Sequence, residues 1–186
     1  MRKRYIVTIL TALAIVGYMT LDDQQELEVV ISDTLADQEP DYIIEGLDAE
    51  SYDEQGMLTQ QISAEKALHY PQDDITVLEK PAVILHENNQ PKWGVKSNSG
   101  RLLKNETIHL SGEVIILPLQ SNGSDFSLST ASLNIDLIKQ IADTDDTVLI
   151  ESDNSQLNAQ GMTIILDKQL VNFKSQVRGR HVPKTH

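Results

Sequence analysis

The stretch that decides the fold is "PKWGVKSNSGRLLKNETIHLSGEVIIL", Pro91 to Leu117, in which apolar residues recur at every second position. Three pairs have this spacing: Trp93 and Val95, Ile108 and Leu110, and Val114 and Ile116. Side chains two residues apart lie on the same face of a β-strand. The stretch therefore predicts strands with one apolar face, which either closes a core or lines a space that holds a ligand.

Similar alternation continues on both sides of this stretch. The segment "ITVLEKPAVILHE", Ile75 to Glu87, reads as strand interrupted by Pro81, which has no N–H for a ladder hydrogen bond and so marks an edge or a bulge. Asn122-Gly123 is a typical hairpin turn. Helical periodicity is nearly absent after the N-terminal segment. Short strands separated by turns predict an all-β sandwich, barrel or roll.

Two further patterns refine this expectation. Apolar residues occupy even-numbered positions around Leu128 and odd-numbered positions around Leu133. This switch predicts a bulge near Ser129 to Thr130. A faint internal repeat relates "SGRLLKNETIHLSGEV", Ser99 to Val114, to "QGMTIILDKQLVNFKSQV", Gln160 to Val177. Each copy has a glycine, an apolar run, a polar turn and an alternating run that ends in valine, as a repeated β unit would.

The composition excludes several classes of protein. At 186 residues the chain suits one domain with an appendage. A formal net charge of -13 argues against nucleic-acid binding, which needs basic patches. The chain has no cysteine, which excludes a disulfide scaffold, a cysteine zinc site, a cysteine nucleophile and a lipidated lipoprotein.

The N-terminus predicts a membrane anchor. A basic leader, "MRKR", precedes the uncharged run "YIVTILTALAIVGYMTL", Tyr5 to Leu21, which as a helix would reach about 26 Å, near the lower limit for crossing a bilayer core. A cleaved signal peptide is the alternative, but the clean small-x-small site, Ala12-x-Ala14, lies inside the apolar run. By the positive-inside rule the N-terminus lies in the cytoplasm and the rest of the chain outside.

We therefore expect five segments along the chain. They are a cytoplasmic basic leader at 1–4, a transmembrane anchor at 5–21, an acidic tether at 22–41, a β-domain at 42–182 and a tail at 183–186.

Residues that could carry chemistry are scattered. The histidines are His69, His86, His109, His181 and His186, and no pair has metal-ligand spacing. The run "DTDD", Asp143 to Asp146, begins like a calcium loop but lacks its glycine and terminal glutamate, so a solvated acidic turn is expected. No nucleophile elbow or phosphate-binding loop occurs. We expect no catalytic residue, metal or cofactor, although a carboxylate pair acting on a glycan stays open.

Several motifs occur in the order found in a known family. They are "PDY" (Pro40–Tyr42), "DEQGMLTQQISAEKALHY" (Asp53–Tyr70), "KPAVILHENNQPKWGVKSNSGRLLKNETIHLSGEV" (Lys80–Val114), "LNIDL" (Leu133–Leu137) and "NAQGM" (Asn158–Met162). Together with the basic leader and apolar span, they make the chain resemble the LptC family, the single-span inner-membrane component of the bacterial lipopolysaccharide exporter. The resemblance extends to about Val182. Its most specific part is Pro-x-Trp-x-Val followed by Leu-x-Gly-x-Val.

The resemblance implies a periplasmic open β-jellyroll, an OstA-like twisted roll, behind a transmembrane helix in the bacterial inner membrane. It implies a non-catalytic protein that receives lipopolysaccharide from the ABC transporter complex of LptB, LptF and LptG and passes it to the periplasmic bridge protein LptA. Two alternatives remain: a membrane-anchored periplasmic enzyme acting on glycans, and a structural anchor that binds no lipid.

The resemblance also changes the meaning of the apolar face. From the residues alone a closed core is the better interpretation, because most buried apolar strand residues are structural. The family implies an apolar groove for lipid chains, and we expect its lining to include Leu78, Trp93, Val95, Ile108, Leu110, Val114, Ile116, Leu133, Ile135, Val171 and Phe173.

Partners are expected at the two ends of the β-domain. The basic run "LVNFKSQVRGR", Leu170 to Arg180, is expected to pair with LptA. The edge near Tyr42 to Leu47, within the acidic run "EPDYIIEGLDAE", Glu39 to Glu50, is expected to face the periplasmic domains of the transporter complex. The expected interface residues are Tyr42, Ile44, Leu47, Val171, Phe173 and Val177.

Overall fold

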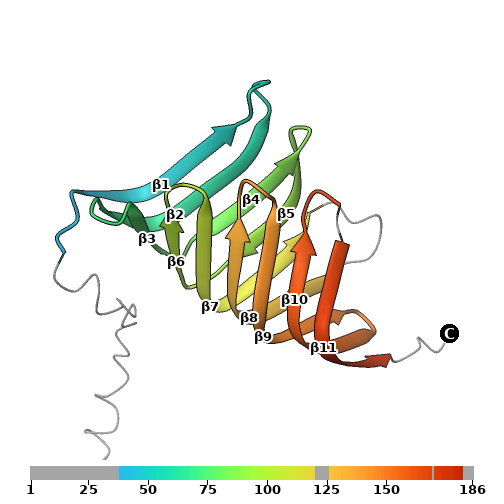
Figure 1. The fold of residues 1–186 in the computed structure, drawn as a ribbon. Coiled ribbons are helices and arrows are strands. Elements are labelled where there is room, and N and C mark those ends of the chain that lie inside the picture. Colours follow the sequence, from blue (N-terminus) through green and yellow to red (C-terminus); the bar gives the residue numbers. More distant parts are fainter. Residues whose placement is uncertain (1–37, 120–125, 169, 182–186) are drawn as a thin grey trace, which may run out of the picture. The chain divides into compact units, whose positions relative to one another are not determined.

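The computed structural model describes residues 38–119, 126–168 and 170–181, which form one antiparallel β-sheet of 11 strands (Figure 1). The strands are β1 (Tyr42–Tyr52), β2 (Leu58–Tyr70), β3 (Ile75–Glu79), β4 (Ala82–Glu87), β5 (Gln90–Lys96), β6 (Ser99–Leu103), β7 (Thr107–Pro118), β8 (Phe126–Asp136), β9 (Ile141–Ser152), β10 (Ser155–Ile165) and β11 (Leu170–His181). The all-β prediction is confirmed.

Among these described residues there is no helix long and apolar enough to cross a membrane. The expected anchor at 5–21, most of the expected tether and the hairpin turn at Asn122-Gly123 lie outside the described residues.

The long strands each contribute to two layers of the bent sheet. Strand β2 pairs with β4 through Gln60–Ser63 and with β3 through Lys66–Tyr70. Likewise β7 pairs with β5 near its C-terminal end and with β6 near its N-terminal end. We call the layer that contains β4 and β5 layer A, and the layer that contains β3 and β6 layer B. The halves of β1, β2 and β7 to β11 complete both layers.

The bends lie on one line across the sheet, which we call the fold line. Pairing registers shift there between Ser111 and Val114 in β7 and between Gln160 and Met162 in β10. Left-handed backbone conformations follow the same line: Gly46 at φ 67°, Lys80 at 45°, Gly112 at 74°, Glu113 at 51°, Gly161 at 74° and Gln176 at 53°. A bulge adds a residue to one strand and bends it, and such a φ angle is a common way to build one.

The fold line explains why the sequence suggested short strands. The register between β8 and β9 shifts between Ser129 and Asn134, so the predicted bulge is confirmed. Leu128 and Leu133 therefore lie on the same, buried side despite their opposite parity. The expectation of short strands is wrong for β2, which has 13 residues and crosses both layers. Its alternation restarts at the bend, so one long strand reads as two short ones.

Two other sequence patterns meet the fold line. The run Asp143–Asp146 was expected to be a turn, and this prediction is wrong. The run is part of β9, at the place where the strand crosses the fold line. The two copies of the internal repeat form the hairpins β6–β7 and β10–β11, which both cross layer B. These copies reach the line at Glu113 and Gln176, which share a left-handed backbone.

The core lies between the two layers. It is one cluster of buried apolar side chains contributed by β2 to β5 and β7 to β10. Val83, Val114 and Leu128 enter it from layer A, and Ile108 and Ile135 from layer B. Because the layers are joined along the fold line, their turns gather at the two outer margins of the sheet. We call these margins lip A (turns 53–57, 88–89 and 153–154) and lip B (turns 71–74, 104–106, 137–140 and 166–168).

Candidate functional site: an apolar interior between two free edges

The predicted lining residues are brought together in the interior. Of the residues expected there, Leu78, Trp93, Val95, Ile108, Leu110, Val114, Ile116, Leu133 and Ile135 are buried. Val171 and Phe173 are partly buried and pack against the same cluster. That these side chains bind lipid stays a prediction, whereas their common location is a feature of the fold.

Sequence reasoning missed part of this interior. Leu128, Val148, Met162 and Ile164 are also fully buried. The last two alternate within "MTIILD", so their periodicity could have identified them. Val148 is harder to recognise, because a polar run precedes it and only a short apolar run follows.

The interior offers almost no polar chemistry. Within the described part of the chain, the buried polar side chains are those of Ser97, Thr130 and Thr144, and none is acidic or basic. Thr144 Oγ1 accepts a hydrogen bond of 3.1 Å from the Asp146 N–H. Thr130 Oγ1 has no hydrogen-bond partner among the described residues. The described ranges also contain no cluster of three or more histidine and carboxylate side chains able to hold a metal ion.

Trp93 connects the two layers at the lips. Its indole comes from β5 in layer A, and only 3% of the residue is exposed. The Nε1–H donates a hydrogen bond of 3.4 Å to the carbonyl oxygen of Leu166, in the turn after β10 at lip B. The N–H of Leu166 in turn donates to the carbonyl of Gln140, 2.9 Å away in the neighbouring turn. Trp93 thus links layer A to lip B.

At the N-terminal edge, β1 pairs with β2 and with no other described strand. The start of β1 is held by His69, whose Nδ1 lies 2.7 Å from Asp41 Oδ1 and whose Nε2 lies 3.3 Å from Asp74 Oδ1. The ring of Tyr42 stacks on the imidazole with centroids 4.5 Å apart. The hydrogen bond that His69 donates to Asp41, helped by the one it donates to Asp74, raises the pKa of His69 above its ordinary value.

The expected interface residues on β1 differ in exposure. Tyr42 and Ile44 are 46% and 39% exposed, whereas Leu47 is partly buried against the core cluster. This edge is acidic: Glu45, Asp48 and Glu50 lie on β1, which carries no basic residue.

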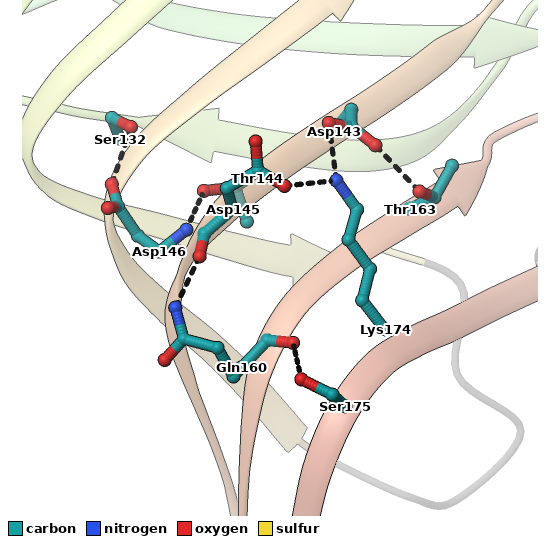
Figure 2. A network of polar contacts seen from close by, with 9 residues as sticks. All are labelled: Ser132, Asp143, Thr144, Asp145, Asp146, Gln160, Thr163, Lys174 and Ser175. Atoms are coloured by element: carbon teal, nitrogen blue, oxygen red, sulfur yellow. Dashed lines mark hydrogen bonds and ion pairs between the residues drawn. The ribbon is translucent and has the colours of Figure 1, made fainter.

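At the C-terminal edge, β11 pairs with β10 and with no other strand that the structure describes. Lys174 Nζ reaches Asp143 Oδ2 at 2.9 Å and Asp145 Oδ1 at 2.7 Å, so it ties β11 across β10 to β9 (Figure 2). A hydrogen bond from Thr163, and then Lys174, lowers the pKa of Asp143. The hydrogen bonds that Lys174 donates to Asp145 and Asp143 raise the pKa of Lys174.

The strand β11 is basic and exposes apolar surface. Lys174, Arg178 and Arg180 lie on it without any acidic residue. Val177, an expected interface residue, is 52% exposed, while Val171 and Phe173 reach inward to the core cluster. The interior is thus continuous with both free edges.

Three comparisons relate this arrangement to known proteins. The model of the family described as "Lipopolysaccharide-assembly, LptC-related" matches residues 7–182. The chain is 20% identical over 151 residues to the lipopolysaccharide export system protein LptC of Escherichia coli K12, covering 80% of this chain and 77% of that protein. The LptC of Shigella flexneri matches to the same extent.

A solved structure has a similar fold. It is that of LptH, the LptA-homologous periplasmic component of the lipopolysaccharide transport device from Pseudomonas aeruginosa. The TM-score is 0.52 at 11% sequence identity, over 67% of this chain and 95% of that chain. At this identity the likeness shows a shared β-jellyroll-like fold.

The family match settles the class of protein. LptC-related proteins are inner-membrane-anchored periplasmic components of lipopolysaccharide transport and are not enzymes, which removes the glycan-active enzyme as an alternative. With its family model matched from residue 7 to residue 182, the chain belongs to the LptC-related family of lipopolysaccharide-assembly proteins.

Proposed function

We propose that this domain carries lipopolysaccharide through its apolar interior, from the transporter complex of LptB, LptF and LptG to LptA. The observation that carries the proposal is the continuity of one apolar cluster from edge to edge. Leu47 packs against it from β1, and Val171 and Phe173 pack against it from β11.

The chemistry of the interior suits acyl chains. Its buried side chains are aliphatic apart from Trp93 and Met162, with Phe126 and Phe173 packed against them, and no residue with an acidic or basic side chain is buried among those that the structure describes. Shielding apolar surface from water contributes about 25 cal/mol per Å², so a few hundred Å² of acyl chain gains several kcal/mol. A sugar-binding site would instead need stacking aromatic rings and hydrogen-bonding groups.

The edges set the proposed direction of transfer. A free strand edge presents unpaired backbone N–H and C=O groups, to which a strand of another protein can add. The basic strand β11 pairs with LptA, and the acidic strand β1 faces the periplasmic parts of the transporter complex. An added strand would extend the sheet and join the apolar interiors of successive proteins.

The remaining segments hold this domain at the membrane. Residues 5–21 form a single span with residues 1–4 in the cytoplasm. Residues 22–41 link the span to the domain at 42–182, and residues 183–186 form a tail. The uncharged apolar run and the basic leader before it support this division.

Site-specific photo-crosslinking tests lipid carriage. Ile135 and Asn134 are adjacent on β8, but Ile135 is buried and Asn134 is exposed, where its Oδ1 lies 2.6 Å from His109 Nδ1. A photoreactive residue at Ile135 should capture lipopolysaccharide during transport, and one at Asn134 should not. Capture at Asn134 alone, or at neither site in a folded and exported protein, would favour the structural anchor that binds no lipid.

Truncation tests the outgoing edge. Removing residues from Leu170 onward should abolish capture of LptA while association with the transporter complex persists. Circular dichroism and proteolysis of the truncated protein establish whether the remaining sheet is folded. A folded truncation that still captures LptA would show that β11 is not the docking strand.

A further inference from the structure

The interior is closed in this structure. The side chains of Ile108, Leu110, Ile116, Leu128, Leu133 and Ile135 have no accessible surface. A side chain with no accessible surface has no void beside it large enough for a water molecule, and native cores are packed to this density. An acyl chain is wider than a water molecule. If lipid enters this part of the interior, the two layers must therefore move apart.

The layers are hinged on one side. Along the fold line the strands bend at bulges, and even the non-glycine residues Lys80, Glu113 and Gln176 take left-handed backbone conformations there. Irregular backbone of this kind concentrates bending, because it interrupts the ladder of hydrogen bonds. A change in angle between the layers would need little rearrangement elsewhere in the sheet.

The opposite side is bridged by Trp93. Its indole is anchored in layer A through the pairing of β5 with β4 and β7, and it donates to Leu166 of lip B. Leu166 is fixed to Gln140 in the next turn. The bond at 3.4 Å is long for an N–H···O hydrogen bond, so it is easily broken and remade.

We propose that Trp93 is the latch of a lipid gate: its indole holds the lips together, and entering acyl chains displace it while the layers part at the fold line. This rests on the proposed function. The exchange is close to balanced, because the indole gives up apolar contacts with the core and gains apolar contacts with the acyl chain.

The chain carries its own reporter of the gate, because Trp93 is the only tryptophan among its 186 residues. The full chain, reconstituted in phospholipid nanodiscs, is mixed with purified lipopolysaccharide or with deacylated lipopolysaccharide. Binding is measured separately by co-elution. Lipopolysaccharide should shift the emission maximum of Trp93 and change its quenching by acrylamide at least twofold, while the deacylated form should change neither.

A pair of variants separates a latch from a structural role. Trp93→Phe keeps an aromatic ring but loses the Nε1–H donor, and it should capture fluorescently labelled lipopolysaccharide several-fold faster than the parent chain. Val148→Ala, a buried change in β9 away from the lips, should lower stability without accelerating capture. If both variants accelerate capture equally, the effect is loss of stability and the latch is wrong.

The outcomes distinguish the gate from the function beneath it. If lipopolysaccharide co-elutes but Trp93 emission and quenching stay constant and Trp93→Phe captures at the parental rate, the gate is overturned and lipid carriage stands. If lipopolysaccharide does not co-elute at all, the proposed function fails and the gate fails with it.

Discussion

The two edge strands of the sheet, β1 and β11, have similar backbones but opposite charge. Both β1 and β11 pair on one side only, and both cross the fold line with a left-handed residue, Gly46 in β1 and Gln176 in β11. Yet β1 is acidic and held at its start by His69, whereas β11 is basic and held near its bend by Lys174. A free edge offers the same backbone groups to any strand, so on the proposed function the charge of each edge would distinguish one partner from another.

The side chains that hold the two edges, His69 at β1 and Lys174 at β11, respond differently to pH. Lys174 stays charged at all physiological pH values, and its pKa is raised further by Asp145 and Asp143. The pKa of His69 is raised by its hydrogen bonds to Asp41 and Asp74, and histidine is the side chain whose ordinary pKa lies nearest to physiological pH. The C-terminal edge is therefore held permanently, and the N-terminal edge is held conditionally.

The largest expected contrast concerns two glycines of the fold line. A Cβ at Gly161 would lie 2.6 Å from Cδ and 3.1 Å from Cβ of Lys174, whereas a Cβ at Gly46 would meet nothing within 4 Å. Gly46→Ala should cost about 1–2 kcal/mol through backbone strain alone. Gly161→Ala should cost about 2–4 kcal/mol, because crowding of β11 adds to the strain. Urea unfolding followed by Trp93 fluorescence compares the two, and equal losses would refute the crowding.

Charge reversal at the edges should separate their partners. Arg178→Glu with Arg180→Glu, both exposed on β11, should weaken LptA binding about tenfold at low salt, with less effect as salt screens the charges. The matched control, Glu45→Lys with Asp48→Lys on β1, should leave LptA binding unchanged. Titration calorimetry at two salt concentrations measures both. If only the β1 control bound LptA more weakly, β1 and not β11 would be the edge that pairs with LptA.

Removing the Lys174 clamp should loosen one edge only. Lys174→Met keeps an aliphatic stem over Gly161 but leaves Asp143 and Asp145 without their cation. Because both ion pairs are exposed to solvent, the free energy of unfolding of the whole domain should change little. Hydrogen exchange should quicken in β11 and not in β1. Lys139→Met, which breaks the 2.7 Å pair with Asp136, is the control and should leave β11 exchange unchanged.

The smallest expected effect is a pH dependence of the N-terminal edge. Protonated His69 donates to both Asp41 and Asp74, whereas the neutral ring has one N–H and can donate to one of them. Since the folded pKa is raised, the stabilisation is complete below the unfolded pKa of about 6.5 and fades as pH rises through the folded pKa. Amide exchange in Tyr42–Leu47, corrected for the intrinsic rate, should quicken over that range. His69→Gln should abolish this dependence, and its persistence would assign it to another group.

Much of this fold could be predicted from local pattern. Ile108 and Leu110 were identified as sharing a face because alternation within one strand is a property of adjacent residues. The irregular pairing after Ser129 in β8 was identified because it shifts the parity of that alternation. The left-handed conformations at Glu113 and Gln176 were not, because neither residue type favours them and the bend is imposed by neighbouring strands.

Contacts between distant segments could not be predicted from the sequence for a different reason. Trp93 and Leu166 are 73 positions apart, and their hydrogen bond depends on how the layers fold over one another. The ion pairs of His69 and Lys174 could not be predicted either, because their partners are common acidic residues with no distinctive spacing. The apolar interior could thus be predicted in large part, whereas the side chains that link its two layers and hold its edges could not.

The meander from β7 to β11 also has a kinetic consequence. Each of these strands pairs with the one before it in the sequence, so every step closes only a short loop. This half of the domain can therefore form in the order in which it is synthesised, with each completed strand serving as the template for the next. If a partner's strand docks on β11, as we propose, it repeats the same elementary step with a different chain. On that proposal, assembly with the partner continues the folding of the domain, and it begins only when β11 is in place.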